Sequence, residues 1–237
     1  IEPKFVTNHI TKAKEIVVQD SNYNLYLITN QGKVLWKKKL NGKILGEVTQ
    51  VDLYKNGRLQ LIFTTEKRLY VIDRNGRDVK PFPKIFRDKI TQPLSVFDYD
   101  NNKNYRFLIT QGNELLMYDS KGKIVKGFKY DTSDKILYSP KHFRIKNKDI
   151  ISVMTTKGLK ILNRRGKIRI KIKDNVRFSN SDIYRYNNNL IGISVDGNLT
   201  QINMNGSISY RKLDLSENHK INSKYNLTVI NSGNKLT

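Results

Sequence analysis

Four oxygen-bearing side chains alternate along one short polar segment, and their spacing is suited to binding a cation. They are Asp98, Asp100, Asn102 and Asn104. Alternate residues of a loop can turn their oxygens toward one ion, and calcium takes about six to eight oxygen ligands. A bidentate carboxylate would be expected near the end of such a loop, but Arg106 and Ile109 follow instead. The segment is a candidate calcium loop, and a tight polar turn between two strands is the alternative.

Catalytic signatures are missing from the sequence. The three histidines, His9, His142 and His219, are scattered, and none has a partner at metal-ligand spacing. Gly-x-Ser-x-Gly, His-Glu-x-x-His and phosphate-binding Gly-x-x-x-x-Gly-Lys motifs do not occur. The absence of cysteine excludes disulfides, thiolate zinc sites and a cysteine nucleophile. We therefore predict a non-enzymatic chain with no cofactor.

Positive charge is the main compositional feature. The chain has 44 Lys and Arg residues against 21 Asp and Glu residues, which gives a formal net charge of +23. Such a charge attracts polyanions, namely nucleic acid, anionic lipid or acidic glycan. The candidate polyanion contacts are Lys37, Lys38, Lys39, Arg164, Arg165 and Lys167. The alternative is that these cations are solvated groups on edge strands and loops, in a composition that is rich in Lys, Asn, Ile and Tyr.

A repeat of roughly 44 residues organises the whole sequence. Five glycines are spaced by 44, 46, 44 and 40 residues: Gly32, Gly76, Gly122, Gly166 and Gly206. A leucine stands seven residues before each of them: Leu25, Leu69, Leu115, Leu159 and Leu199. A short polar residue stands three before: Thr29, Asp73, Asp119, Asn163 and Asn203. Agreement at several offsets in five copies indicates one repeated structural unit.

The repeat contains a turn between two antiparallel strands. Asp73 to Gly76 and Asp119 to Gly122 place Asp first and Gly fourth, which suits a type I turn with a left-handed glycine. In the third repeat the strand after the turn is predicted over 123–126. Two further apolar runs precede each turn, so the unit has four strands. Because its middle strands are apolar on both faces, both faces of each sheet must be covered.

These features predict an all-β chain that forms a β-propeller of four-stranded antiparallel blades. We expect a single propeller domain over 1–237, with five blades and a truncated sixth. The predicted blades are 1–43, 44–87, 88–133, 134–174, 175–215 and a partial blade over 216–237. The alternating segment 167–173 is predicted to be an exposed edge strand, where charge prevents edge-to-edge pairing. No apolar run approaches the roughly 18 residues of a membrane span.

Two repeat families resemble this sequence. The segment from Leu25 to Trp36 resembles the PQQ-like, quinoprotein-type repeat, which has Gly-x-x-x-Trp in this strand pair. The segments 51–63 and 97–109 resemble the Asp-rich loop and strand of FG-GAP repeats. Both resemblances imply a β-propeller, whereas the Gly-His and Trp-Asp signatures of WD repeats are missing. The other four repeats depart from the PQQ-like pattern, because Lys80, Lys126, Ile170 and Tyr210 replace the tryptophan.

The resemblances imply an exported protein of a bacterial periplasm or cell envelope. They include non-catalytic scaffolds of outer-membrane assembly as well as quinone-dependent oxidoreductases. Our leading hypothesis is a non-catalytic module that binds a protein or an envelope component through its rim loops or its central face. A basic polyanion-binding module and a quinone-dependent oxidoreductase are the alternatives. We expect Trp36 to pack between adjacent blades rather than to stack on a ligand.

Overall fold

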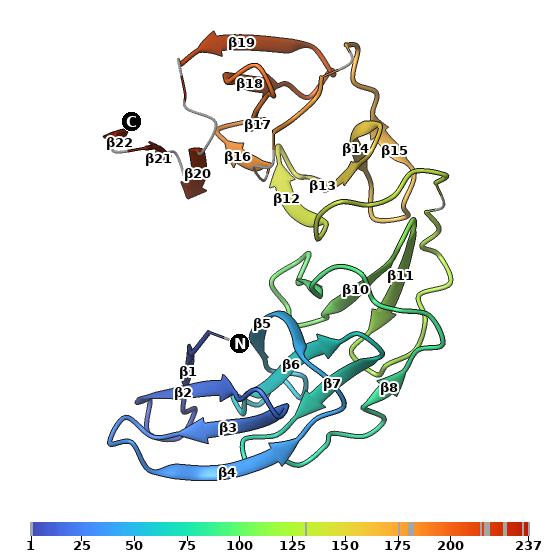
Figure 1. Ribbon diagram of the computed structural model, residues 1–237. Helices are drawn as coiled ribbons and strands as arrows, with labels where there is room; N and C mark the ends of the chain where they lie inside the picture. Colours follow the sequence, from blue (N-terminus) through green and yellow to red (C-terminus); the bar gives the residue numbers. More distant parts are fainter. Residues whose placement is uncertain are drawn as a thin grey trace. The chain divides into compact units, whose positions relative to one another are not determined.

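The computed structural model describes residues 2–130, 132–174, 176–179, 183–213, 215, 219–224, 227–233 and 235–236. All its described elements are β-strands, most of them labelled in Figure 1. The chain divides into two compact units, unit 1 over 1–127 and unit 2 over 128–237, and each is described by itself. The single domain predicted over 1–237 therefore stays a prediction. No helix among the described residues is long and apolar enough to cross a membrane.

Unit 1 contains three antiparallel sheets, each formed by consecutive strands. The first consists of β1 (Lys4–Thr7), β2 (Lys14–Gln19), β3 (Asn24–Ile28) and β4 (Val34–Lys39). The second consists of β5 (Ile44–Val51), β6 (Gln60–Thr65), β7 (Arg68–Ile72) and β8 (Lys84–Ile85). The third consists of β9 (Ser95–Phe97), β10 (Arg106–Gln111) and β11 (Glu114–Asp119).

Unit 2 continues the same meander. Its first sheet consists of β12 (Lys141–Ile145), β13 (Lys148–Thr155), β14 (Gly158–Leu162) and β15 (Ile168–Ile170). Its second consists of β16 (Tyr184–Tyr186), β17 (Asn189–Ile193), β18 (Asn198–Ile202) and β19 (Ile208–Lys212). Its third consists of β20 (His219–Lys224), β21 (Leu227–Ser232) and β22 (Lys235–Leu236).

The repeated turns form as predicted. The amide of Gly76 donates to the carbonyl of Asp73 over 3.0 Å, and the carboxylate of Asp73 accepts from the amides of Asn75 and Arg77. Gly76 has a φ of 77°, the left-handed conformation that glycine tolerates best. The turns that end at Gly32, Gly122, Gly166 and Gly206 have the same first bond, at 2.9 to 3.1 Å. The polar residue three positions before each glycine is therefore the acceptor that closes the turn.

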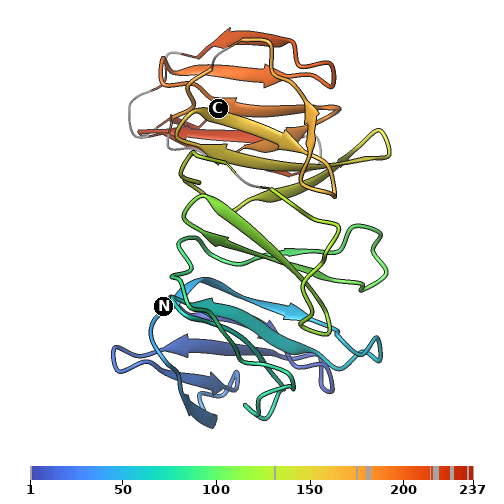
Figure 2. The same ribbon diagram turned by 90° about the vertical axis from the view of Figure 1, so that its right-hand side faces the viewer.

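The middle strands of the second and fourth sheets are buried on both faces. Every residue of β6 is buried, as are all residues of β13 after Lys148. One hydrophobic cluster joins the first two sheets of unit 1, which lie face to face in Figure 2. The burial predicted from the continuous apolar runs is confirmed for these strands, whereas β2 and β3 alternate buried with half-exposed residues.

Neighbouring sheets dock at the turn glycines. Ring atoms of Trp36, on β4 of the first sheet, lie 2.9 to 3.3 Å from where a Cβ would stand on Gly76 of the second. Its indole Nε1 donates a 2.7 Å hydrogen bond to the carbonyl of Arg74. In unit 2 the carbonyl of Lys171 lies 2.1 Å from the corresponding point on Gly206. Trp36 therefore packs between adjacent sheets, as predicted, and glycine is required wherever the preceding sheet approaches so closely.

The outer strands differ from the prediction in two places. The strand predicted over 123–126 does not form. Ile124 makes an isolated bridge to Tyr118, and the chain turns away near Gly127. In the second sheet Asp78 makes a similar bridge, and β8 forms only after Pro83, since proline cannot donate to the ladder. Within the described residues, four sheets thus have four strands and two have three.

Two predicted strands reach residues outside the described ranges. The strand that begins near Asp182 is described from Tyr184 as β16, and Asp182 itself lies outside the described residues. The strand predicted over 226–230 is β21, and Asn226 lies outside the described residues as well. Both strands pair with their neighbours as a meander requires.

Candidate functional site

Three loops of unit 1 are joined to one another by hydrogen bonds. They connect the first and second strands of their sheets and cover 8–13, 52–59 and 98–105. We call them the loop rim. The equivalent connection in the fourth sheet is the two-residue turn of Lys146 and Asn147. The long loops are thus a feature of unit 1 and are not required by the repeat.

In the second and third loops, an aspartate side chain accepts hydrogen bonds from main-chain amides of its own loop. The carboxylate of Asp52 accepts from the amides of Asn56 and Gly57 over 3.0 and 2.9 Å. The carboxylate of Asp98 accepts from the amides of Asn102 and Lys103 over 3.1 and 2.9 Å. Such side-chain-to-backbone bonds replace strand pairing and fix a turn locally. The two loops therefore share one conformational device.

Hydrogen bonds also connect each loop to the next. The amide of Leu59 donates to Nδ1 of His9 over 3.3 Å, which joins the first and second loops. Lys103 donates to the buried carboxylate of Asp52 over 2.6 Å, which joins the second and third. Lys55 donates to the side-chain oxygen of Asn104 over 2.7 Å. The three loops are therefore held in fixed register with one another.

The pKa shifts of Asp52 and His9 agree with these hydrogen bonds. Burial raises the pKa of Asp52, but the hydrogen bonds from Lys103, Gly57 and Asn56 outweigh it and hold that pKa below its usual value. Burial lowers the pKa of His9, and the positive charge of Arg74 lowers it further. The neutral imidazole is the form that can accept a hydrogen bond from Leu59. The charge states thus favour the bonds that join the loops.

The loop rim exposes apolar and cationic side chains. Ile10 is 72% exposed and Tyr54 is 61% exposed. Lys12 and Lys55 lie on the same two loops with positive φ, at 63° and 55°. Non-glycine residues pay a conformational cost in this region, and such positions cluster at binding and catalytic sites. The arrangement suits contact with a partner surface.

Hydrogen bonds already engage three of the four candidate calcium residues. The carboxylate of Asp98 accepts hydrogen bonds from two amides of the loop. The side-chain oxygen of Asn102 accepts from the amide of Asn104 over 3.0 Å. Asn104 accepts from Lys55, so a cation already stands beside it. Among the described residues no group of three or more acidic, His or Cys side chains could hold a metal ion. These bonds are of the kind expected in a tight polar turn, and calcium binding by this loop stays untested.

The cations of β4 are largely engaged within unit 1. Lys38 pairs with Asp78 over 3.1 Å and so connects the first sheet to the second. The ammonium groups of Lys37 and Lys39 lie 5.6 and 5.9 Å from the ring centroids of two tyrosines, Tyr26 and Tyr23. Cation–π contacts at exposed sites contribute about 0.5–1 kcal/mol. The cluster is a packed outer strand whose lysines lie on both faces.

The basic cluster of unit 2 divides in two. Arg164 turns inward and pairs with the buried carboxylate of Asp149, which also contacts Nε2 of His142 over 2.9 Å. Burial lowers the pKa of His142, and Asp149 opposes that effect. Arg165 and Lys167 are exposed and make no ion pair with any described residue. Only the second pair therefore has free charge for a polyanion.

A serine–histidine contact in unit 2 was not foreseen from the sequence. Oγ of Ser179 lies 3.0 Å from Nε2 of His219. The hydroxyl also donates its single proton to the carbonyl of Ile193 over 3.1 Å. With the hydroxyl donating to Ile193, the histidine is the donor to the serine in this contact. The contact joins the segment before β16 to the start of β20.

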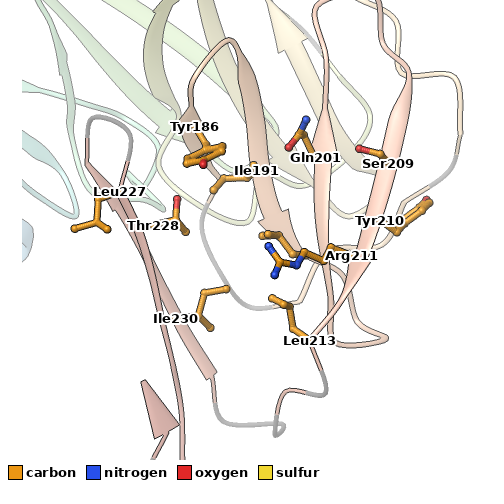
Figure 3. Close-up of a pocket in the computed structure, with 11 residues that line it drawn as sticks. Tyr186, Ile191, Gln201, Ser209, Tyr210, Arg211, Leu213, Leu227, Thr228 and Ile230 are labelled. Atoms are coloured by element: carbon orange, nitrogen blue, oxygen red, sulfur yellow. The ribbon is translucent and has the colours of Figure 1, made fainter. Parts of the chain in front are cut away.

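A pocket of about 390 Å³ lies between the β16–β19 sheet and β21 in unit 2. Figure 3 shows its lining, with the Arg211 side chain extending toward the middle of the pocket. Gln201 and Ser209 are directly paired across β18 and β19, so they lie on one face with Arg211. The rest of the lining is mostly apolar and includes Ile191 and Ile230. No described lining residue of the pocket is acidic.

Comparisons with known proteins identify the architecture. No family model matches the chain, and no curated protein matches it. BamB from Moraxella catarrhalis is 13% identical, with a TM-score of 0.64 over 98% of this chain and 66% of its own. BBS1N, solved in complex with ARL6DN, is 11% identical, with a TM-score of 0.64 over 96% and 72%. Both are β-propeller proteins. The chain has a β-propeller fold.

A third solved structure with a propeller is also similar to this chain. The dihydro-heme d1 dehydrogenase NirN, solved in complex with DHE, is 12% identical, with a TM-score of 0.63 over 97% of this chain and 50% of its own. The chain thus spans about two thirds of the BamB chain and half of the NirN chain. The prediction of a β-propeller is confirmed, and the described residues form six antiparallel sheets. Identities this low show the fold alone.

Proposed function

We propose that this chain is a non-catalytic β-propeller module that binds a protein, such as a component of a bacterial cell envelope, through the loop rim. The observation that carries the proposal is the set of cross-loop bonds, from His9 to Leu59 and from Lys103 to Asp52. They hold Ile10 and Tyr54 exposed on fixed loops. A preorganised surface loses less conformational entropy on binding than a mobile one.

The chemistry of the loop rim fits a protein partner. Tyrosine and arginine are enriched among the residues that dominate binding energy, and the second loop presents both in Tyr54 and Arg58. Loops on a rigid scaffold commonly carry binding functions. BBS1N, whose fold is similar, is solved with a protein bound, which supports the proposal by analogy.

The loop geometry also supports membership of a known repeat type. We infer a PQQ-like or FG-GAP-like repeat, from Trp36 against Gly76 and from the matching aspartate loops at Asp52 and Asp98. Neither resemblance has a matching family model. The envelope location follows from the same resemblance.

Polyanion binding is a second candidate function. It rests on the outer strand of the fourth sheet and the turn before it, where Arg169 of β15 and Arg165 and Lys167 of the turn are all exposed. No ion pair neutralises these three cations within the described part of the chain. Several phosphate or sulfate contacts on such a strand would give strongly salt-dependent affinity.

Comparative affinity capture tests the leading proposal. The baits are the unaltered chain, an Ile10→Asp variant and an Ile85→Asp variant, with a lysate of the source cells at high salt. The Ile85→Asp variant is the matched control, because Ile85 is 71% exposed and Ile10 is 72% exposed in the same unit. We expect one protein that the unaltered and Ile85→Asp baits retain and the Ile10→Asp bait loses. Equal retention by all three baits would refute binding through the loop rim.

A further inference from the structure

A lysine-bordered hollow in unit 2 arises where β15 leaves its neighbour. β14 pairs with β15 only at Ile161 and Leu162, with a register shift between them. In the next sheet, β18 and β19 pair at five consecutive positions. The separation leaves a hollow of about 580 Å³ between the start of β14 and the segment that follows Ile170. This volume lies within the ~300–1,000 Å³ range of small-ligand sites.

The floor of this hollow is apolar. Leu159, Ile170 and Val176 are all buried, and Ile172 and Phe178 are half-buried beside them. The oxygen of Val176 lies 3.5 Å from the position of a Cβ on Gly158, so the chain closes one end of the hollow. A small hydrophilic anion would make no apolar contact with the side chains of this floor.

The border of the hollow is cationic. Its lysines are Lys157, Lys160, Lys171 and Lys173, and Asp174 is the one acid among the described lining residues. Lys157 is already paired with Asp134 over 2.9 Å. Lys171 and Lys173 are exposed and have no ion pair within the described ranges. Two ammonium groups thus remain available above an apolar floor.

The backbone that carries these two lysines is fixed. The amide of Lys173 donates to the carbonyl of Gly206 over 3.1 Å. The carbonyl of Lys171 approaches the same glycine so closely that a Cβ there would lie 2.1 Å away. A second hollow of about 590 Å³ borders the same segment and adds Arg169 to its lining. The backbone positions of Lys171 and Lys173 are therefore fixed relative to Gly206.

We propose that this hollow binds an anionic amphiphile, with a phosphate or carboxylate head between Lys171 and Lys173 and an alkyl tail on the floor of Leu159, Ile170 and Phe178. A phosphate ester or fatty acid in solution and an acidic lipid in a membrane share this chemistry. The site is in unit 2 and is independent of the loop rim.

Calorimetric titration of the whole chain tests the proposal with octyl phosphate, inorganic phosphate and octyl glucoside. We expect one octyl phosphate per chain, bound at least about tenfold more tightly than either other probe, since head and tail each contribute. A Lys171→Gln/Lys173→Gln variant should lose about tenfold in affinity. A Lys121→Gln/Lys123→Gln variant is the matched control, because both lysines are exposed in unit 1.

Two results would overturn the proposal. Equal affinity for octyl phosphate and inorganic phosphate would show attraction by charge alone. An equal loss in the control variant would show a nonspecific effect of net charge. Vesicles of phosphatidylcholine with and without phosphatidylserine distinguish the two sources. Sedimentation with the acidic vesicles that needs Lys171 and Lys173 supports a membrane lipid, and octyl phosphate binding without sedimentation supports a free amphiphile.

Discussion

The indole of Trp36 donates its N–H to the main-chain carbonyl of Arg74 over 2.7 Å. The ring covers Gly76 two residues later, so one side chain contacts two residues of the neighbouring turn. Lys38 adds an ion pair to Asp78 from the same strand. The outer strand of the first sheet is thus joined to the second sheet over the whole turn.

Replacing Trp36 tests this junction. Trp36→Phe keeps a ring over Gly76 but removes the hydrogen bond, and should lower the free energy of unfolding by about 1 kcal/mol. Trp36→Ala also removes the ring and should cost about 3 kcal/mol. Urea denaturation followed by circular dichroism measures both, since the chain has no other tryptophan. A cost below about 1 kcal/mol for Trp36→Ala would show that the ring contributes little to packing.

Gly206 and Gly32 provide a second test, because both have a φ of +84°. Nothing lies within 4 Å of a Cβ placed on Gly32, whereas one on Gly206 would lie 2.1 Å from the carbonyl of Lys171. Gly32→Ala should cost about 1 kcal/mol for the backbone conformation alone. Gly206→Ala should cost at least about 3 kcal/mol, because backbone must move as well. If the two variants lose equal free energy of unfolding in thermal or urea denaturation, the docking role of Gly206 is ruled out.

Asp20 predicts an acid-sensitive turn between β2 and β3. A side-chain hydrogen bond from Asn24, with further bonds from its amide and from Tyr26, lowers the pKa of Asp20 to about 2. A carboxyl with a lowered folded pKa stabilises the fold fully above its unfolded pKa of 3.8 and loses that contribution as the pH falls toward 2. Asp20→Asn should flatten this part of the stability profile.

NMR titration of the Asp20 carboxyl carbon measures that pKa directly. A midpoint near 2 agrees with the hydrogen-bonded turn, and a midpoint near 3.8 would show that the carboxylate is free in solution. The unfolding midpoint of the Asp20→Asn variant at several pH values gives the matching stability change.

The second candidate function predicts which cations matter for polyanions. Arg165→Gln/Lys167→Gln should weaken heparin or oligonucleotide binding more than Lys38→Gln/Arg164→Gln, because Lys38 and Arg164 are already paired with aspartates. Fluorescence anisotropy at roughly 50 and 200 mM salt should show a loss of orders of magnitude across that range. No binding at the lower salt would eliminate this function.

Local features of the fold were predictable because they depend on nearby residues. The five turn glycines, the polar acceptors three residues before them and the double-sided burial of β6 follow from turn chemistry and strand period. The inter-sheet position of Trp36 followed from the repeat resemblance. The strand over 123–126 was wrong, because the chain turns at Gly127 before a ladder can form.

The candidate site was less predictable because its bonds join distant residues. His9 and Leu59 are 50 positions apart, and Asp52 and Lys103 are 51 apart. Only the packing of successive sheets brings such loops together. The recurrence of similar aspartate loops at Asp52 and Asp98 was visible in the sequence, but which lysine reaches which carboxylate was not. The hollow beside β15 depends on where that strand leaves β14, which no local pattern specifies.

Titration of the purified captured partner into three forms of the chain tests the central claim most directly. The forms are the unaltered chain, Ile10→Asp and Ile85→Asp, measured by calorimetry at high salt. Binding through the loop rim predicts a loss of about tenfold or more for Ile10→Asp and unchanged affinity for Ile85→Asp. Equal affinity for all three forms would contradict a role for the loop rim in binding that partner.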